Sequence, residues 1–145
     1  MTGINFATAW EVVADNQGDR LALQNGDTVR TWTEYEDRSA RLAAVLDSDG
    51  IGAGDNVACA LYNGNEYPEA QFAAFKLEAA PCNVNYRYVE NELAYLVDNS
   101  DAKAVFFDDA LTERFAAVRS QLAKARRWIH VGEGECPDWA VRHQD

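Results

Sequence analysis

The stretch Val57-Ala58-Cys59-Ala60-Leu61-Tyr62, with Glu66–Glu78 and Pro81–Val84 behind it, decides the fold class. The first and last segments are short apolar runs, which are typical of buried strands, and the middle one is long enough for a helix. We expect Asn65 to be the N-cap of that helix, and Pro68 lies in its first turn, where a missing N–H costs little. Two strands joined by a helix favour parallel pairing through a right-handed crossover.

Before this unit, the sequence predicts a hairpin between two helices. Phe6–Asn16 has an amphipathic helical pattern, and Leu21–Gln24 and Thr28–Trp32 are predicted strands. Asn25-Gly26 lies between the strands and favours a tight turn, because both residues tolerate positive φ. The second helix follows, with Thr33 and Glu36 predicted to form its capping box.

After the unit, the alternation of helix and strand continues to position 131, with predicted elements at Glu90–Asn99, Ala104–Phe107, Ala110–Ala125 and Trp128–Val131. We therefore expect an α/β fold: a mostly parallel, doubly wound sheet with flanking helices and an N-terminal β-hairpin. Residues 1–131 form one predicted subdomain, and residues 132–145 show no period and are expected to be an irregular tail or linker.

The helix at 66–78 is apolar nearly all round, which predicts burial on more than one side. One side is expected to pack on the sheet. We expect the other to leave an apolar patch through which the chain self-associates.

Composition excludes several classes of function. The net charge is −11, so binding to nucleic acid is not expected. The three cysteines, Cys59, Cys82 and Cys136, are well separated, which argues against a disulfide framework or a paired-cysteine zinc site and favours the cytoplasm. The N-terminus has no signal-peptide pattern, and no apolar run is long enough for a transmembrane segment.

The residues that most often carry chemistry are poorly placed for it. The glycines of Gly50–Gly54 lead from a helix into a strand, which is the wrong polarity for a phosphate loop, and His130 and His143 have no metal-binding spacing. Asp108 and Asp109 follow a predicted strand, where acidic residues can bind a metal. We instead expect Asp109 to cap the next helix, and no catalytic, cofactor-binding or metal residue is assigned.

Two polar segments remain at the strand-to-helix edge of the sheet, where ligands of open α/β sheets bind. They are Tyr62–Tyr67 and Asn83–Tyr88, and both are rich in amide and phenol groups that suit pocket walls. Turn and cap chemistry explains them equally well. The candidate pocket-edge residues are Tyr62, Asn63, Asn65, Asn83, Asn85, Tyr86 and Arg87.

An ordered set of motifs resembles one known family, the AMP-forming acyl-CoA synthetases of the adenylate-forming superfamily. The set covers roughly residues 4 to 109 and consists of Thr31-Trp32-Thr33-Glu34-Tyr35, Gly54-Asp55-Asn56-Val57, Asn63-Gly64-Asn65-Glu66, the run from Ala74 through Lys76 to Asn83-Val84-Asn85-Tyr86-Arg87-Tyr88, Glu92-Leu93-Ala94-Tyr95-Leu96 and Asp101-Ala102-Lys103-Ala104-Val105.

This resemblance implies part of the first subdomain of a ligase that activates a carboxylic acid, a fatty or sterol side-chain acid, with ATP and Mg²⁺ and transfers it to CoA. The family's phosphate-binding loop and catalytic lysine match no position here, so this piece is expected to be inactive and to bind none of these cofactors alone. Its expected partner is the remainder of its own synthetase chain.

Two other functions stay open at this point. The chain would serve as a standalone interaction module if it paired with a synthetase or another partner. A flavodoxin-like or receiver-like domain fits the helix–strand alternation, and Asp108 would then be the acidic residue of interest.

Overall fold

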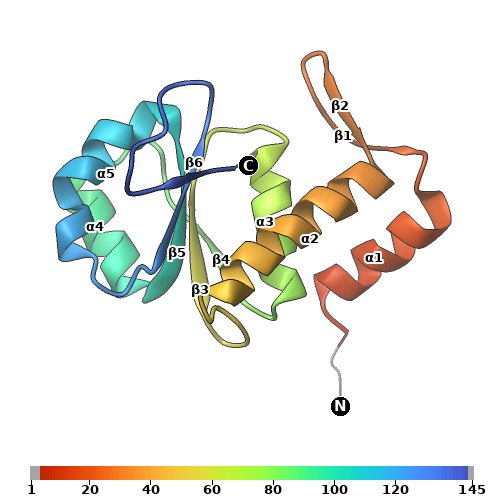
Figure 1. Ribbon diagram of the computed structural model, residues 1–145, viewed down its shortest axis with the longest axis horizontal. Helices are drawn as coiled ribbons and strands as arrows, with labels where there is room; N and C mark the ends of the chain where they lie inside the picture. Colours follow the sequence, from red (N-terminus) through yellow and green to blue (C-terminus); the bar gives the residue numbers. More distant parts are fainter. Residues whose placement is uncertain (1–3, 144–145) are drawn as a thin grey trace.

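The computed structural model describes residues 4–143, and its centre is a parallel sheet of five strands in the order β4-β3-β5-β6-β7 (Figure 1). The strands are β3 (Asn56–Ala60), β4 (Ala80–Asn83), β5 (Ala102–Asp108), β6 (Arg127–Val131) and β7 (Val141–Arg142). The α/β class and the parallel pairing predicted from the sequence are confirmed.

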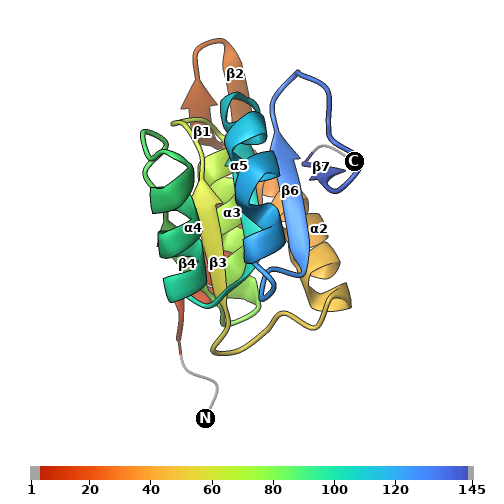
Figure 2. The same cartoon turned by 90° about the vertical axis from the view of Figure 1, so that its left-hand side faces the viewer.

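Helices cover both faces of this sheet, as expected for a doubly wound fold. On one face lie α2 (Trp32–Ser48) and α3 (Glu66–Lys76), with α1 (Phe6–Gln17) packed outside them (Figure 1). On the other face lie α4 (Glu90–Asn99) and α5 (Thr112–Val118), which stand in front of the sheet in Figure 2. The predicted helix at 110–125 is wrong in its extent, because α5 is flanked by the short 3-10 turns Asp109–Leu111 and Arg119–Gln121.

The N-terminal hairpin is present and projects beyond the N-terminal end of α2 (Figure 1). Its strands are β1 (Leu21–Asn25) and β2 (Thr28–Thr31), which pair antiparallel. The turn is one residue later than predicted, because Asn25 pairs with Thr28 and the loop is Gly26-Asp27. Gly26 has φ = 58°, a left-handed conformation that glycine adopts without strain.

The capping of α2 also differs from the prediction. The Thr31 hydroxyl accepts a hydrogen bond from the Glu34 amide at 3.2 Å, and the Glu34 carboxylate accepts one from the Thr31 amide at 2.8 Å. The capping box is therefore Thr31 and Glu34, two residues before the predicted pair of Thr33 and Glu36. The strand β2 sets this start, since Thr31 still has extended backbone angles.

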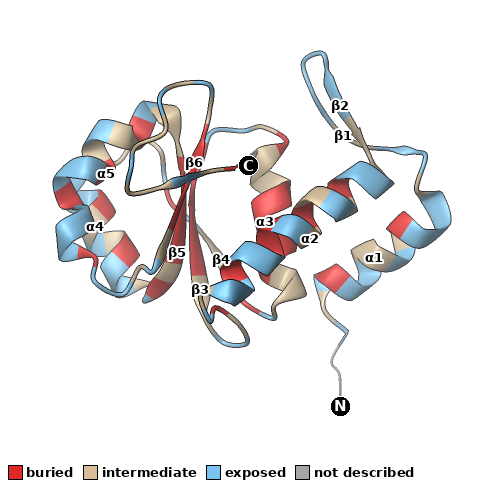
Figure 3. Cartoon of the chain, in the orientation of Figure 1, coloured by how far each residue is buried: buried red, intermediate tan, exposed pale blue. Residues whose placement is uncertain are grey.

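The helix α3 is buried on two sides, as its all-round apolar character predicts (Figure 3). Ala70, Ala73 and Ala74 pack toward the sheet, while Phe72 joins the cluster formed with α1 and α2. The expected apolar patch on this helix is wrong: the exposed large apolar side chains of the described residues all lie outside residues 66–78. Self-association through this helix therefore loses its support.

The C-terminal segment is more ordered than the predicted tail. The strand β7 pairs parallel with β6, and Arg142 donates hydrogen bonds to the carbonyl oxygens of Gly132 and Gly134 at 2.7 and 2.8 Å. The Trp139 ring stacks on Phe107 with a centroid distance of 5.2 Å. Residues up to 143 thus belong to the folded body. Over the range that the structure describes, none of the helices is long and apolar enough to cross a membrane.

Candidate functional site

The candidate site lies at the carboxyl ends of β3 and β4, where the loops that follow these two strands begin. The two polar segments singled out in the sequence meet there around an open cavity of about 470 Å³. The cavity is lined by Leu61, Asn63, Tyr67, Asn83, Asn85, Tyr86 and Arg87. Five of the seven candidate pocket-edge residues line it, and the remaining two, Tyr62 and Asn65, are placed differently.

Two aromatic rings connect the segments. The rings of Tyr62 and Tyr86 contact each other in a tilted arrangement, with an interplanar angle of 35° and centroids 4.3 Å apart. The Arg87 guanidinium lies 5.7 Å from the centroid of the Tyr86 ring, within the range of a cation–π contact. Tyr62 is 43% exposed, so the stack offers an aromatic surface at the mouth of the cavity rather than a sealed core contact.

The floor of the cavity is held by a phenol–amide pair. The Tyr67 hydroxyl, on α3, donates a hydrogen bond of 2.7 Å to Oδ1 of Asn83 at the end of β4. Burial, and to a lesser degree the neighbouring Cys59, raises the pKa of Tyr67 to about 12. Tyr67 therefore stays a neutral hydrogen-bonding group at neutral pH.

The loop after β4 is fixed from the opposite face of the sheet. Arg114, on α5, donates hydrogen bonds to the carbonyl oxygens of Tyr86 and Tyr88 at 3.1 and 2.9 Å. Asn85 accepts a hydrogen bond from the Arg87 amide at 2.9 Å, which is an Asx-type turn. Both explanations offered by the sequence thus apply here, since Asn85 shapes the turn and also lines the cavity.

Asn65 has a role that the sequence did not predict. Its side chain makes no capping hydrogen bond to α3, and its Nδ2 donates instead to the carbonyl oxygen of Thr28 in the hairpin, at 3.1 Å. Asn65 is buried, and it ties the start of α3 to β2. It is therefore a structural link and not part of the cavity wall.

A smaller hollow of about 220 Å³ adjoins the first and shares Leu61 and Asn63 with it. Its other lining groups come from the end of β1, from the segment between β3 and α3, and from the ends of β5 and β6. They are Asn25, Tyr62, Gly64, Glu66, Asp108, Val131, Gly132 and Glu133. The carboxyl ends of four neighbouring strands therefore border one continuous polar edge.

The two aspartates at the end of β5 differ from the prediction that Asp109 caps the next helix. Asp108, and not Asp109, is the capping residue, because its side chain accepts a hydrogen bond from the Ala110 amide at 3.0 Å. Asp109 lies with Oδ1 2.9 Å from Nε2 of the buried His130. Since Asp108 already serves as a cap, the phosphate-accepting role of a receiver-like domain has no support from its geometry.

The groups at this edge suit binding rather than catalysis. Amides, phenols and one guanidinium supply hydrogen bonds and aromatic surface, but no nucleophile–base pair is found among the cavity-lining residues. Within residues 4–143, no group of three or more His, Cys, Asp or Glu side chains is arranged to hold a metal ion. We therefore assign no ATP, Mg²⁺ or CoA contact to these side chains.

Sequence reasoning missed three contributors to the site, Leu61, Tyr67 and Arg114. Leu61 is buried in the core and only borders the cavity, so its apolar character gave no signal. Arg114 lies in a helix distant in sequence, and only the tertiary fold brings it to the loop. Tyr67 was not among the predicted pocket-edge residues, although it belongs to the polar segment Tyr62–Tyr67. Its place in the first turn of the predicted helix, next to that segment, was the available signal.

Comparison with known proteins identifies the family. The profile of the AMP-binding enzyme family matches residues 10–143. The medium-chain acyl-CoA ligase Mig of Mycobacterium avium is 38% identical over 160 residues, covering 99% of this chain and 29% of that protein. The 3-oxocholest-4-en-26-oate–CoA ligase of Rhodococcus rhodochrous is 35% identical, covering 95% of this chain and 25% of that protein. The chain thus spans little more than a quarter of these relatives.

Solved structures share the fold. A protein assigned as a long-chain-fatty-acid–CoA ligase from Rhodopseudomonas palustris superimposes with a TM-score of 0.89 at 25% identity, covering 99% of this chain and 36% of that one. The N-terminal domain of FACL13 from Mycobacterium tuberculosis gives a TM-score of 0.81 at 24% identity, over 87% of this chain and 33% of that one. Sequence and fold agree, and the chain belongs to the AMP-binding enzyme family, with curated acyl-CoA ligases among its relatives.

Proposed function

We propose that this chain is the N-terminal part of an AMP-forming acid–CoA ligase. In the proposed reaction, the carboxylate attacks the α-phosphate of ATP and pyrophosphate leaves, which gives an acyl-adenylate. The CoA thiolate then attacks the acyl carbon, and AMP leaves. The observation that carries the proposal is the family match over residues 10–143 together with relatives that are named as acyl-CoA ligases.

The proposed substrate is a fatty acid or a sterol side-chain acid. Two relatives support this class by their names, a medium-chain acyl-CoA ligase and a 3-oxocholest-4-en-26-oate–CoA ligase. The cavity at the carboxyl edge fits a supporting role, because Tyr62 and Tyr86 offer aromatic surface and the asparagines offer hydrogen bonds. We propose that this edge forms part of the wall of the acid pocket.

The chain itself would contribute scaffold and pocket wall, and the reacting groups would come from other parts of the ligase. ATP, Mg²⁺ and CoA are proposed for the whole ligase and not for this portion alone. A cytoplasmic location is proposed with it, and the unpaired thiols of Cys59 and Cys82 support a reducing compartment.

A graft tests the proposal. The chain replaces the homologous segment of the M. avium ligase, and ATP–pyrophosphate exchange is measured with octanoate. We expect exchange from the chimera and none from the 145-residue chain alone. Exchange by the chain alone would show that adenylation needs nothing outside it. A folded chimera that binds ATP and is silent with every acid would contradict the role of the chain in acid activation.

The same chimera tests whether the carboxyl edge of the sheet forms part of the wall of the acid pocket. Tyr86→Ala removes half of the aromatic stack, so we expect KM for the acid to rise with KM for ATP unchanged. Tyr95→Ala is the matched control, because Tyr95 is 70% exposed and lies on α4 outside this cavity. Equal effects of the two substitutions would remove the edge from the acid pocket.

A further inference from the structure

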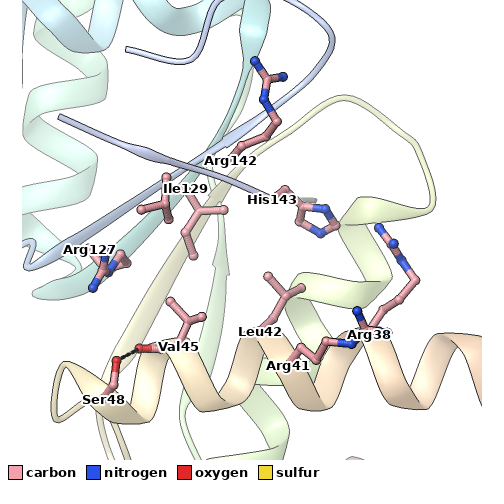
Figure 4. A pocket seen from close by; sticks show the side chains of 10 residues that line it. Arg38, Arg41, Leu42, Val45, Ser48, Arg127, Ile129, Arg142 and His143 are labelled. Atoms are coloured by element: carbon pink, nitrogen blue, oxygen red, sulfur yellow. Dashed lines mark hydrogen bonds between the residues drawn. The ribbon is translucent and has the colours of Figure 1, made fainter. Parts of the chain in front are cut away.

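A second cavity, of about 330 Å³, lies between α2 and the β6–β7 edge of the sheet (Figure 4). It shares no residue with the candidate site at the carboxyl edge. It is lined by Arg38, Arg41, Leu42, Val45, Ser48, Arg127, Ile129, Val141, Arg142 and His143. No acidic residue is among these described lining residues, although the chain carries a net charge of −11.

Hydrogen-bonding nitrogen atoms gather at one end of this cavity. Figure 4 shows Arg38, Arg41 and His143 at that end, with Leu42, Val45 and Ile129 beyond them. Arg38 uses its Nε to bind the buried Glu69 at 2.7 Å, which leaves its terminal nitrogens for another partner. Arg41 pairs with Asp37, and both of these side chains are exposed, so water screens that pair.

His143 is the second, independent sign of a ligand. Its side chain is 2% exposed, yet neither ring nitrogen has a hydrogen-bond partner within the described part of the chain. Its Nε2 lies 3.2 Å from Oε2 of Glu69 in a geometry that makes no hydrogen bond. Buried polar groups almost always have partners, so a polar atom of a bound molecule would complete this end of the cavity.

The middle of the cavity is apolar. Arg38, Leu42 and Val45 lie on one face of α2 at spacings of four and three residues, and Ser48 follows one turn later. Residues 38 and 48 are ten steps apart on the helix, about 15 Å, since each residue rises about 1.5 Å. Ile129 and Val141 form the opposite wall, and Arg127, which binds Asp49, lies at the far end.

We infer that this cavity binds an aliphatic carboxylate as a second ligand site, separate from the proposed acid pocket. The carboxylate of the ligand would accept hydrogen bonds from Arg38, Arg41 and His143. The aliphatic part of the ligand would lie along Leu42 and Val45. Guanidinium binds a carboxylate through two parallel hydrogen bonds, and the apolar middle of the cavity favours a ligand with an aliphatic part over a fully hydrophilic anion such as free phosphate. The inference does not depend on the ligase function.

Octanoate is the probe. We expect it to shift the backbone amide resonances of residues 38–48 and 141–143 at neutral pH, with 1-octanol and octylammonium much weaker. The bound charge would also raise the pKa of His143, which burial first and then Arg38 and Arg30 lower to about 4 in the free chain. The other groups that face His143 are Glu69 and, in the same strand, Arg142.

Two substitutions test where the carboxylate and the alkyl chain of octanoate bind. Arg41→Gln removes an exposed guanidinium without touching the core, and we expect octanoate binding to weaken about fivefold or more. Val45→Asp places a carboxylate in the cavity and should abolish binding. Arg20→Gln and Val12→Asp are the matched controls, because both positions are exposed and outside the cavity. Equal binding of octanol, unchanged binding in both cavity variants, or shifts confined to residues 61–67 and 83–87 would each overturn the inference.

Discussion

The two faces of the sheet are stabilised by different chemistry. Beneath α4 and α5, the buried side chains are aliphatic and aromatic, and Phe107, Phe115, Trp128 and Trp139 pack ring against ring. Beneath and outside α2 and α3, an apolar cluster of alanines and small aliphatic residues is joined by buried charges. Both faces exclude water, and the first also holds the buried His130 beside Asp109, but only the second joins several distant segments through one buried carboxylate, that of Glu69.

The charged cluster joins segments that are far apart in the sequence. The fully buried Glu69 of α3 binds Arg38 of α2, with Arg30 of the hairpin 3.8 Å and His143 of the C-terminal segment 3.2 Å from its carboxylate. Burial raises the pKa of Glu69, while the hydrogen bond from Arg38 opposes that shift. The apolar face is tolerant of exchange between side chains of similar volume, whereas removal of one member of this cluster leaves its partners without a hydrogen bond or an ion pair.

The largest expected change in the free energy of unfolding is from Glu69→Ala. It removes the fully buried carboxylate that binds Arg38, whose side chain is 24% exposed, so we expect a loss of about 3 kcal/mol or more in the free energy of unfolding, the lower end for breaking a buried ion pair. The measurement is the free energy of unfolding from urea titration. Asp37→Ala is the control, because it breaks the exposed pair with Arg41 and should cost less than about 1 kcal/mol. Similar losses in both variants would mean that burial of the charge has no special weight.

On the apolar face, Leu111→Ala should cost about 3 kcal/mol, through lost burial and the cavity left behind. Leu111 is 1% exposed and belongs to the cluster beneath α4 and α5. The loss of stability caused by Leu111→Ala should be the same at pH 5 and pH 7.5, because the Leu111 side chain has no charged partner. A pH-dependent loss at this position would remove the contrast between the two faces.

The charged face should show acid sensitivity that depends on His143. Burial lowers the pKa of His143 to about 4 in the folded chain, from an ordinary value near 6.5. The folded state therefore disfavours protonation of His143. The stability that neutral His143 contributes is complete above pH 6.5 and is lost as pH falls toward 4. The raised pKa of Glu69 acts in the opposite direction, because the folded state then favours its protonated form at low pH.

Comparison with His143→Gln isolates the histidine. Between pH 7.5 and 4.5, the native chain should lose about 2 kcal/mol more stability than the variant, since one pKa unit corresponds to about 1.4 kcal/mol and Glu69 offsets part of the shift. The measurement is a series of urea titrations over this range. His130→Gln is not a suitable control, because His130 contacts Asp109. A parallel pH dependence in native chain and variant would contradict the assignment.

The apolar face was largely predictable from the sequence, and the charged face was not. Leu111, Phe115, Val118 and Leu122 repeat at helical spacing, and all four are buried as that pattern predicts, although the helix is shorter than expected. The strands also follow from short apolar runs. These signals are local, so a single segment contains them.

The charged face depends on pairings that no local pattern contains. The contacts of Glu69 join positions 31, 39 and 74 residues away, and the two residues of β7 become a strand only because β6 provides a partner. At the candidate site, periodicity located the two polar segments at the sheet edge, but it did not separate Asn65, which binds the hairpin, from Asn63 and Asn83, which line the cavity.

The smallest effects concern how the helices on the two faces begin. On the charged face, α2 has a complete capping box, so Thr31→Ala should cost about 1 kcal/mol, while Thr33→Ala, at the exposed residue first predicted to cap, should cost little.

On the apolar face, α4 has only half of the same motif. The Glu92 carboxylate accepts a hydrogen bond from the Val89 amide at 3.0 Å, but the valine side chain has no oxygen with which to return it. Val89 is 51% exposed and has the extended backbone of an N-cap, so Val89→Ser should complete the box and stabilise the chain by about 0.5–1 kcal/mol. Urea titration measures the gain, and Glu92→Gln in the Val89→Ser background tests its origin. A loss on Val89→Ser would mean that the exposed isopropyl group contributes more to the loop at 85–89 than a cap can supply.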